Sequence, residues 1–174
     1  MRKYIYFLPL LFFTILGVCF YSYLGKDATI IPSATINKNL PEMHVRMLET
    51  PESAIKISDV SQSPYLLNIW ASWCTSCVKE HQALQQLHAN GIKIIGVAYK
   101  DEIKQAREWL RRYGNPYELT LIDTEGDFAF ELGVYGVPET YLISADGMIL
   151  HKWIGELKQN MLNDIIEQFK VLND

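Results

Sequence analysis

The sequence predicts an α/β domain with a mixed central sheet and helices on both of its faces, preceded by an N-terminal transmembrane helix. An apolar stretch without a charged residue runs from Tyr4 to Leu24. Two apolar runs of strand length, at 65–70 and 92–99, are each followed by a segment of helical character. Strands that alternate with helices pair in parallel through right-handed crossovers, and an Asp-Gly hairpin signal near the C-terminus adds antiparallel strands.

The apolar stretch Tyr4–Leu24 is the first element. As a helix its 21 residues rise about 31 Å, close to the thickness of the hydrocarbon core of a bilayer. Arg2 and Lys3 precede it, so the N-terminus should stay in the cytoplasm and the chain beyond the stretch should lie outside. Because the stretch exceeds a signal-peptide core and no small-x-small cleavage site follows, we expect an uncleaved anchor rather than a cleaved signal peptide. Cys19 follows the bulky Val18, which argues against lipoprotein processing and favours a lone thiol in an apolar helix.

The chain of 174 residues divides into an anchor at 1–24, a linker at 25–40 and one globular domain at 41–174. The linker lacks clear periodicity and holds Gly, Pro, Ser and Asn, which are common in loops. Without its two N-terminal basic residues the chain carries 14 basic and 20 acidic side chains, and no basic cluster with interleaved aromatic residues is present. This charge balance argues against nucleic acid as a partner.

The domain alternates between strands and helices in chain order. Apolar runs bounded by turn residues mark the strands, Gly91 and Gly114 end the two longer helices, and Asp146-Gly147 is typical of a two-residue type I′ hairpin turn. The expected elements are strands at 43–48, 65–70, 92–99 and 119–122, helices at 78–90 and 102–113, a short helix or turn at 128–132, a hairpin of strands at 141–144 and 148–153, and an amphipathic helix at 157–172.

A Cys-x-x-Cys motif, WASWCTSC at 70–77, follows the strand at 65–70 directly. Structural zinc sites usually need four ligands, and neither a second cysteine pair nor a pair of suitably spaced histidines is present. Attachment of a c-type haem needs a histidine directly after the second cysteine, where Val78 stands. A purely structural disulfide over so short a loop would add little stability. Export places the pair where disulfides persist, so redox exchange is the favoured interpretation.

Cys74 falls where a buried strand ends and a helix begins. The first helical turn has unpaired N–H groups and the positive end of the helix dipole, which stabilise a thiolate. We therefore expect the pKa of Cys74 to be lowered and its sulfur to be the nucleophile. Cys77 lies one turn further along, where it can attack a mixed disulfide on Cys74 and release the reduced partner. Trp73 either shelters the pair or simply packs at the strand end.

Glu80 shares one helical face with Cys77, Leu84 and Leu87. The two leucines indicate that this face looks inward, where a carboxylate is costly to bury unless it is functional or hydrogen-bonded. Our hypothesis is a carboxyl group with a raised pKa that handles the proton of Cys77. The alternative is a solvated glutamate at the rim of the helix. For the adjacent His81 we expect a surface position or a hydrogen-bonded structural role.

Val137-Pro138 stands just before the first strand of the hairpin. Proline at the start of a strand avoids the loss of a ladder hydrogen bond, and it is the one residue for which a cis bond is cheap. A cis bond here would turn the backbone of Val137 toward the cysteines. Its N–H and C=O could then pair with an extended substrate segment.

Taken together, these motifs resemble the thioredoxin fold and, more narrowly, the membrane-tethered thiol:disulfide interchange proteins of cytochrome c maturation, the CcmG/DsbE family. The resemblance is strong over about residues 66–155, and the N-terminal anchor is similar in kind. The segments that carry it are LLNIWASWC, Glu80-His81, Tyr99-Lys100-Asp101, Gly114-Asn115-Pro116-Tyr117 and GVYGVPET.

The resemblance implies roles for individual residues. Asn68 stands where thioredoxin has a buried aspartate, which strengthens Glu80 as the group that handles the proton. No cofactor other than the redox-active disulfide is implied, and no metal. The implied site consists of the redox pair Cys74 and Cys77, an acidic feature formed by Glu80 and Glu139, the neighbouring Trp73, and a partner-binding segment at Val137 and a cis Pro138.

The resemblance also implies an inner-membrane protein with a periplasmic domain. A membrane reductant of the DsbD/CcdA type would supply electrons, and the CxxCH cysteines of apocytochrome c or a CcmH-type partner would receive them. Thr75-Ser76 replaces the Pro-containing dipeptides common between such cysteines, so the strength of the reductant stays open. Two other functions also stay open: a general periplasmic oxidant or isomerase, and a copper-handling assembly chaperone.

Overall fold

The computed structural model describes residues 7–23 and 35–173, which belong to two separate units. The first unit contains α1 (Phe7–Tyr23), a helix of 17 residues. Among the described residues, none of the helices combines the length and the apolar character needed to cross a bilayer. The predicted transmembrane helix is therefore not confirmed. Residues 4–6 and 24 of the predicted anchor and residues 25–34 of the linker lie outside the described residues.

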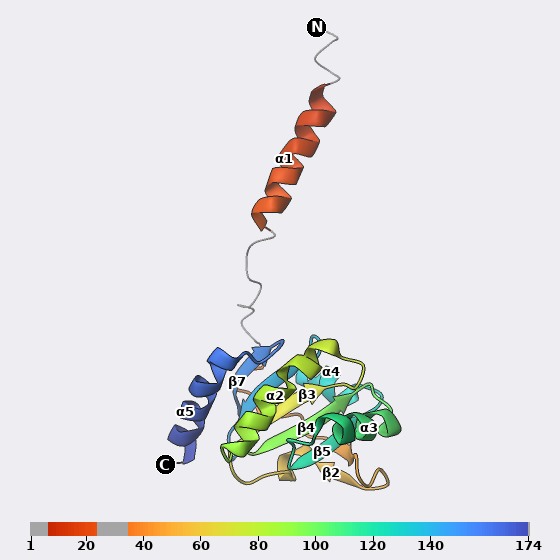
Figure 1. Cartoon of the computed structure of the whole chain (residues 1–174), viewed down its shortest axis with the longest axis vertical. Coiled ribbons are helices and arrows are strands. Elements are labelled where there is room, and N and C mark those ends of the chain that lie inside the picture. The colour runs from red at the N-terminus through yellow and green to blue at the C-terminus, as the bar shows by residue number, and fades with distance from the viewer. Residues whose placement is uncertain (1–6, 24–34, 174) are drawn as a thin grey trace. The chain divides into compact units, whose positions relative to one another are not determined.

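The second unit contains the predicted alternation of strands and helices (Figure 1). All the strands and helices expected from the sequence are present, with ends that shift by a few residues, and β2 and η2 are additions. The elements are β1 (His44–Met47), β2 (Ala54–Lys56), the 3-10 helix η2 (Ile57–Asp59), β3 (Tyr65–Trp70), α2 (Thr75–Ala89), β4 (Ile94–Tyr99), α3 (Ile103–Tyr113), β5 (Leu119–Asp123), α4 (Asp127–Leu132), β6 (Glu139–Ile143), β7 (Ile149–Ile154), the 3-10 helix η3 (Gln159–Met161) and α5 (Leu162–Asn173).

The strands form one mixed sheet in the order β2-β1-β5-β4-β3-β6-β7. The three central strands β5, β4 and β3 run parallel, as expected for strands joined by helical crossovers. On one side the hairpin of β6 and β7 is added, with β6 antiparallel to β3. On the other side β1 pairs antiparallel with β5, and β2 pairs antiparallel with β1. Every residue of β3 is buried, because this strand has a neighbour on each side and helices or loops over both faces.

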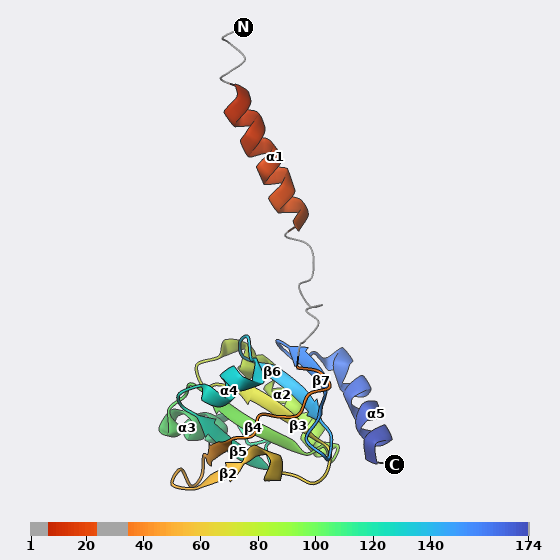
Figure 2. The same ribbon diagram turned by 180° about the vertical axis from the view of Figure 1, so that it is seen from behind.

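Each face of the sheet carries its own apolar core. Side chains of α2, α3 and α5 pack on one face, around Trp70, Leu84 and Ile165. On the other face α4 and η2 cover a second core around Leu67, Val97 and Phe128. In Figure 1 α2 and α3 lie on the near face, and the opposite view in Figure 2 brings α4 to the front. The mixed sheet with helices on both faces is therefore confirmed.

Two details differ from the sequence prediction. The hairpin turn is not the two-residue type I′ turn, since Asp146 is not among the described residues with positive φ and only Gly147 takes that conformation. The N–H of Gly147 donates to Ser144 O, and the Ser144 hydroxyl binds both the Asp146 carboxylate and the N–H of Met148, which stabilises a longer loop. At the other end, the backbone of residues 37–40 is hydrogen-bonded to residues 147–149, so the contacts of the domain begin before residue 41.

Candidate functional site

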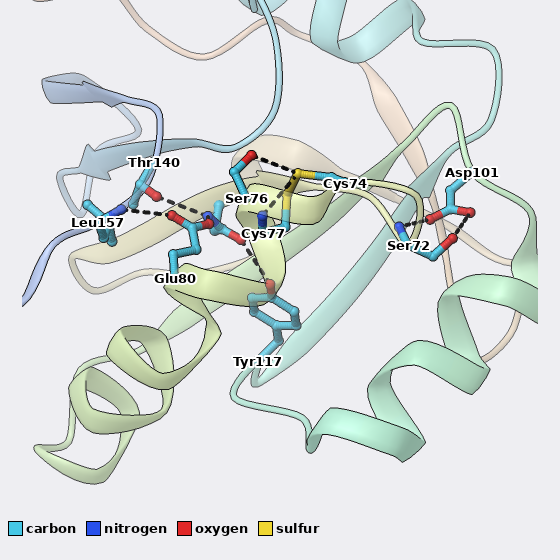
Figure 3. The surroundings of a disulfide bond; sticks show 10 residues. Ser72, Cys74, Ser76, Cys77, Glu80, Asp101, Tyr117, Thr140 and Leu157 are labelled. Carbon is cyan, nitrogen blue, oxygen red and sulfur yellow. Dashed lines mark hydrogen bonds between the residues drawn. A yellow bond between two sulfur atoms is a disulfide. The ribbon is translucent and has the colours of Figure 1, made fainter.

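Cys74 and Cys77 form a disulfide at the start of α2, the helix that follows the buried strand β3 (Figure 3). Cys74 is the N-cap residue, and its sulfur accepts a hydrogen bond from the Cys77 N–H at 3.1 Å. The Ser76 hydroxyl lies 3.5 Å from the same sulfur. Both donors would be better satisfied by a thiolate than by a disulfide sulfur, because an anion is the stronger acceptor. The structure therefore places Cys74 as the sequence predicts for the nucleophile.

The loop that enters the motif is held by the loop after β4. The buried carboxylate of Asp101 accepts hydrogen bonds from the backbone N–H and the hydroxyl of Ser72. The indole N–H of Trp73 donates to Lys100 O at 3.1 Å, and the Trp73 side chain remains 56% exposed. Trp73 therefore lies at the surface beside the disulfide. The sequence analysis used Lys100-Asp101 only as a family-like segment, because nothing in the sequence pairs Asp101 with a residue 29 positions earlier.

Glu80 is fully buried and its carboxylate has two hydrogen-bond donors. Asn68 Nδ2 donates to one oxygen at 3.0 Å, and the N–H of Leu157 donates to the other at 3.1 Å. Loss of hydration on burial raises the pKa of Glu80 to about 7, although the two donors favour the anion. The alternative of a solvated glutamate at the helix rim is wrong.

The amide of Asn68 connects Glu80 to two further buried groups, Thr140 and Tyr117, which are labelled with Glu80 in Figure 3. Its nitrogen also donates to the Thr140 hydroxyl, and its oxygen accepts from the Tyr117 hydroxyl at 2.9 Å. Burial raises the pKa of Tyr117 well above its ordinary value, so the phenol keeps its proton and stays a donor. Tyr117 thereby orients the Asn68 amide with its nitrogen toward Glu80. Asn68 has no acidic proton of its own, which leaves Glu80 as the group of this network that titrates near neutral pH.

Cys77 and Glu80 both lie buried on α2, one helical turn apart. A carboxyl group with a pKa of about 7 can both accept and return a proton near neutral pH. The arrangement fits the predicted role of Glu80 in handling the proton of Cys77. His81 is also buried, with Nε2 3.1 Å from Gly114 O and its ring against Trp109, and burial lowers its pKa. His81 thus has the hydrogen-bonded structural role.

Val137–Pro138 is a cis peptide bond directly before β6. Val137 packs against the core cluster that contains Cys74 and Cys77. Glu139 follows directly, but its side chain points to the face of the sheet opposite Glu80 and forms an ion pair with Lys152 at 3.0 Å. The two glutamates are therefore separate buried centres rather than one acidic feature. Among the described residues no group of histidine, cysteine and carboxylate side chains could hold a metal ion.

Comparisons with known proteins agree with this chemistry. The model of the Redoxin family matches residues 31–168. The chain is 41% identical over 162 residues to the thiol:disulfide interchange protein DsbE of Vibrio cholerae, covering 90% of this chain and 88% of the relative. It is also 41% identical over 144 residues to DsbE of Escherichia coli, covering 82% of this chain and 78% of the relative.

A solved structure supports the fold. A secreted thiol-disulfide isomerase from Corynebacterium glutamicum superposes with a TM-score of 0.67 at 18% identity, covering 86% of this chain and 99% of that one. At this identity the likeness bears on the fold alone. The curated relatives and the Cys74–Cys77 disulfide together establish thiol–disulfide exchange as the chemistry of the site.

The raised pKa of Glu80 predicts a specific pH dependence of stability. The folded state binds this proton more tightly than the unfolded state, whose glutamate has the ordinary pKa of 4.5. The free energy of unfolding should therefore fall as the pH rises from about 4.5 to about 7, by about 3 kcal/mol. Glu80→Gln carries no titrating proton and should lack this decrease. Denaturant unfolding of the oxidised chain below pH ~5 and above pH ~8 measures it.

Glu108→Gln is the matched control, because Glu108 is exposed on α3 and its removal should preserve the wild-type pH profile. The oxidised form is used so that the two thiols do not titrate. Equal pH profiles for the wild type and Glu80→Gln would show that Glu80 does not titrate in this range.

The Ser76 hydroxyl predicts an effect on redox strength. Because this hydroxyl stabilises the thiolate more than the disulfide, Ser76→Ala should destabilise the reduced form relative to the oxidised form. The thiolate absorbance should then appear at higher pH. The equilibrium with glutathione should shift about threefold to tenfold toward the oxidised protein, equivalent to a reduction potential about 14 to 30 mV more negative.

Ser58→Ala removes a hydroxyl from an exposed serine outside the motif and serves as the control with wild-type behaviour. Ser76→Thr keeps a hydroxyl and should stay close to the wild type. A Ser76→Ala variant that matches Ser58→Ala in both measurements would contradict the assigned hydrogen bond.

Proposed function

Because the chain belongs to the Redoxin family and, within it, to the DsbE thiol:disulfide interchange proteins, we propose that it reduces disulfides in apocytochrome c or in the proteins that mature it. The observation that carries this proposal is the combination of the DsbE relationship with a redox disulfide beside a buried, proton-binding glutamate. The resemblance to the CcmG/DsbE family is the basis for proposing cytochrome c biogenesis as the process in which this exchange takes place. Thiol–disulfide exchange itself is common to the named relatives.

We place the domain in the periplasm of a bacterium, held at the inner membrane by residues 4–24. The charge-free apolar sequence of this stretch and the basic residues Arg2 and Lys3 in front of it support that topology. A tethered domain stays close to any partner that acts at the same membrane. Tethering raises the effective concentration of the two without further contacts.

The proposed reaction begins with reduced Cys74 and Cys77. The Cys74 thiolate attacks one sulfur of the partner's disulfide, a bond forms between Cys74 and the partner, and the partner's other sulfur leaves as a thiolate. Glu80 takes the proton of Cys77, whose sulfur then attacks Cys74. The second partner sulfur leaves, two electrons have passed to the partner, and the Cys74–Cys77 disulfide seen in the structure remains.

Repeated turnover needs a source of electrons. The periplasm is kept oxidising, so the Cys74–Cys77 disulfide must be reduced again by a dedicated donor. We propose a membrane reductant of the DsbD/CcdA type as this donor. The acceptor is a CxxCH segment of apocytochrome c or a CcmH-type protein, in which the cysteines must be reduced before haem is attached.

Trapping tests the identity of the partner. Cys77→Ala leaves Cys74 able to form a mixed disulfide that cannot be resolved. The expected result is a covalent adduct with apocytochrome c or a cytochrome maturation protein, identified by mass spectrometry of material captured from the periplasm. The same chain also carries Cys19→Ala, because Cys19 is the one cysteine outside the Cys74–Cys77 motif and could form adducts of its own.

The matched control carries Cys74→Ala as well and should capture nothing. Adducts with unrelated periplasmic proteins alone would support a general oxidant or isomerase and contradict the proposed specificity. Tight, stoichiometric copper binding by the reduced chain would support the chaperone instead.

The reduction potential tests the direction of transfer. Equilibration of the full chain with glutathione buffers should give a value nearer that of thioredoxin, about −270 mV, than that of strong oxidants such as DsbA, about −120 mV. The reason is that a protein can reduce a partner's disulfide only if its own disulfide is comparably stable. A potential close to the oxidant end of this range would overturn the reductase assignment.

A further inference from the structure

Lys152 and Glu139 form a buried ion pair on the face of the sheet opposite Glu80. The Nζ atom of Lys152 lies 3.0 Å from a Glu139 oxygen, and the two side chains are 1% and 0% exposed. Tyr141 donates its hydroxyl proton to the same carboxylate. A buried ion pair adds little to the folding stability compared with apolar side chains in its place. Its presence is better explained by the other groups to which the two charged side chains are hydrogen-bonded.

Both partners reach the loop between α4 and β6, residues 133–137. Lys152 Nζ donates to Gly133 O at 3.1 Å, at the first residue of the loop. The second oxygen of Glu139 accepts the N–H of Tyr135 at 3.0 Å. The Lys152 ammonium also lies over the ring of Tyr135, 4.7 Å from its centre, and Tyr135 is 68% exposed. One ion pair thus fixes the beginning and the middle of the loop.

The other end of this loop lies beside the redox motif. Glu139 pairs with Ile69 in the antiparallel β3–β6 register. Ile69 is five residues before Cys74, and Val137 is two residues before Glu139. Val137 also packs against the cluster that contains both cysteines. A shift of the loop therefore changes the surface against which a disulfide-bearing chain must lie.

We propose that Lys152 and Glu139 are positioning residues, which hold loop 133–137 in the arrangement that receives the backbone of a polypeptide substrate at Cys74. The ion pair does not contact the sulfur atoms. It acts on the reaction only where the substrate extends from its disulfide over the loop. This inference rests on thiol–disulfide exchange and is independent of the proposed role in cytochrome c maturation.

Two probes with the same leaving group separate positioning from chemistry. The first is a ten-residue peptide of arbitrary sequence whose single cysteine carries thionitrobenzoate as a mixed disulfide. The second is the small symmetrical disulfide of thionitrobenzoate. The Cys74 thiolate attacks the sulfur that bears the peptide or the second aromatic group, and thionitrobenzoate leaves as the coloured thiolate. Cys77 then attacks Cys74, and the peptide leaves as a thiol or the second thionitrobenzoate leaves as a thiolate. The first coloured release is therefore the step compared between the two probes. Stopped-flow absorbance on the reduced full chain gives both rate constants.

Lys152→Met should lower the ratio of the peptide rate to the small-molecule rate about tenfold, because reacting atoms that are displaced by a fraction of an ångström lose rate steeply. Lys152→Arg keeps the charge and the donor and should restore most of the ratio. Lys93→Met is the control, since it removes an ion pair with Glu118 that is partly exposed. Its ratio should equal that of the wild type.

A second variant guards against a failure of Lys152→Met to fold. Lys152→Met combined with Glu139→Gln leaves no unpaired buried charge, and glutamine still accepts the N–H of Tyr135. It should still show a lowered ratio, since the bond to Gly133 O is lost. The proposal is overturned if this double variant keeps the wild-type ratio, or if both rates fall in equal proportion, as a merely structural role requires.

Discussion

The complete burial of β3 is the constraint on which the rest of the domain depends. Its six residues lie between β4 and β6 and under side chains on both faces, so the strand can neither shift its register nor move its end. The chain must leave the sheet after Trp70, and α2 begins within five residues. That exit places Cys74 at the N-cap, where its sulfur accepts the N–H of Cys77 in the first turn of the helix. The chemistry at this sulfur is a consequence of where a buried strand ends.

Two buried glutamates lie on different elements and have different partners: Glu80 is on α2 and Glu139 is on β6. Among the described residues no cation lies at hydrogen-bond distance from Glu80, so loss of hydration dominates and raises its pKa to about 7. Glu139 has the Lys152 ammonium at 3.0 Å and serves as an anchor for backbone. The first is suited to exchanging a proton and the second to holding a loop.

The segment after β7 contacts both Glu80 and Pro138, the residue before Glu139. Gly155 donates its N–H to Pro138 O at 2.9 Å, and Leu157, two residues later, donates its N–H to Glu80. One short stretch therefore contacts both the proline segment before β6 and the carboxyl group near Cys77. Because the two donors are only two residues apart in one segment, the backbone at Pro138 and the Glu80 carboxyl group are held in a fixed relation. This explains how a site assembled from distant parts of the chain keeps one geometry.

The sequence by itself determined the order of strands and helices, the redox motif and the inward face of α2, because periodicity and capping residues act over a few neighbouring positions. It also pointed to Glu80, since Leu84 and Leu87 share its face. Only the tertiary structure decided that Asn68, Tyr117 and Leu157 surround that carboxylate. It likewise turned Glu139 away to Lys152, placed Asp101 on Ser72, and formed the hairpin loop through side-chain bonds of Ser144. These pairings join residues that no local pattern relates, and burial sets whether a carboxyl group keeps its proton.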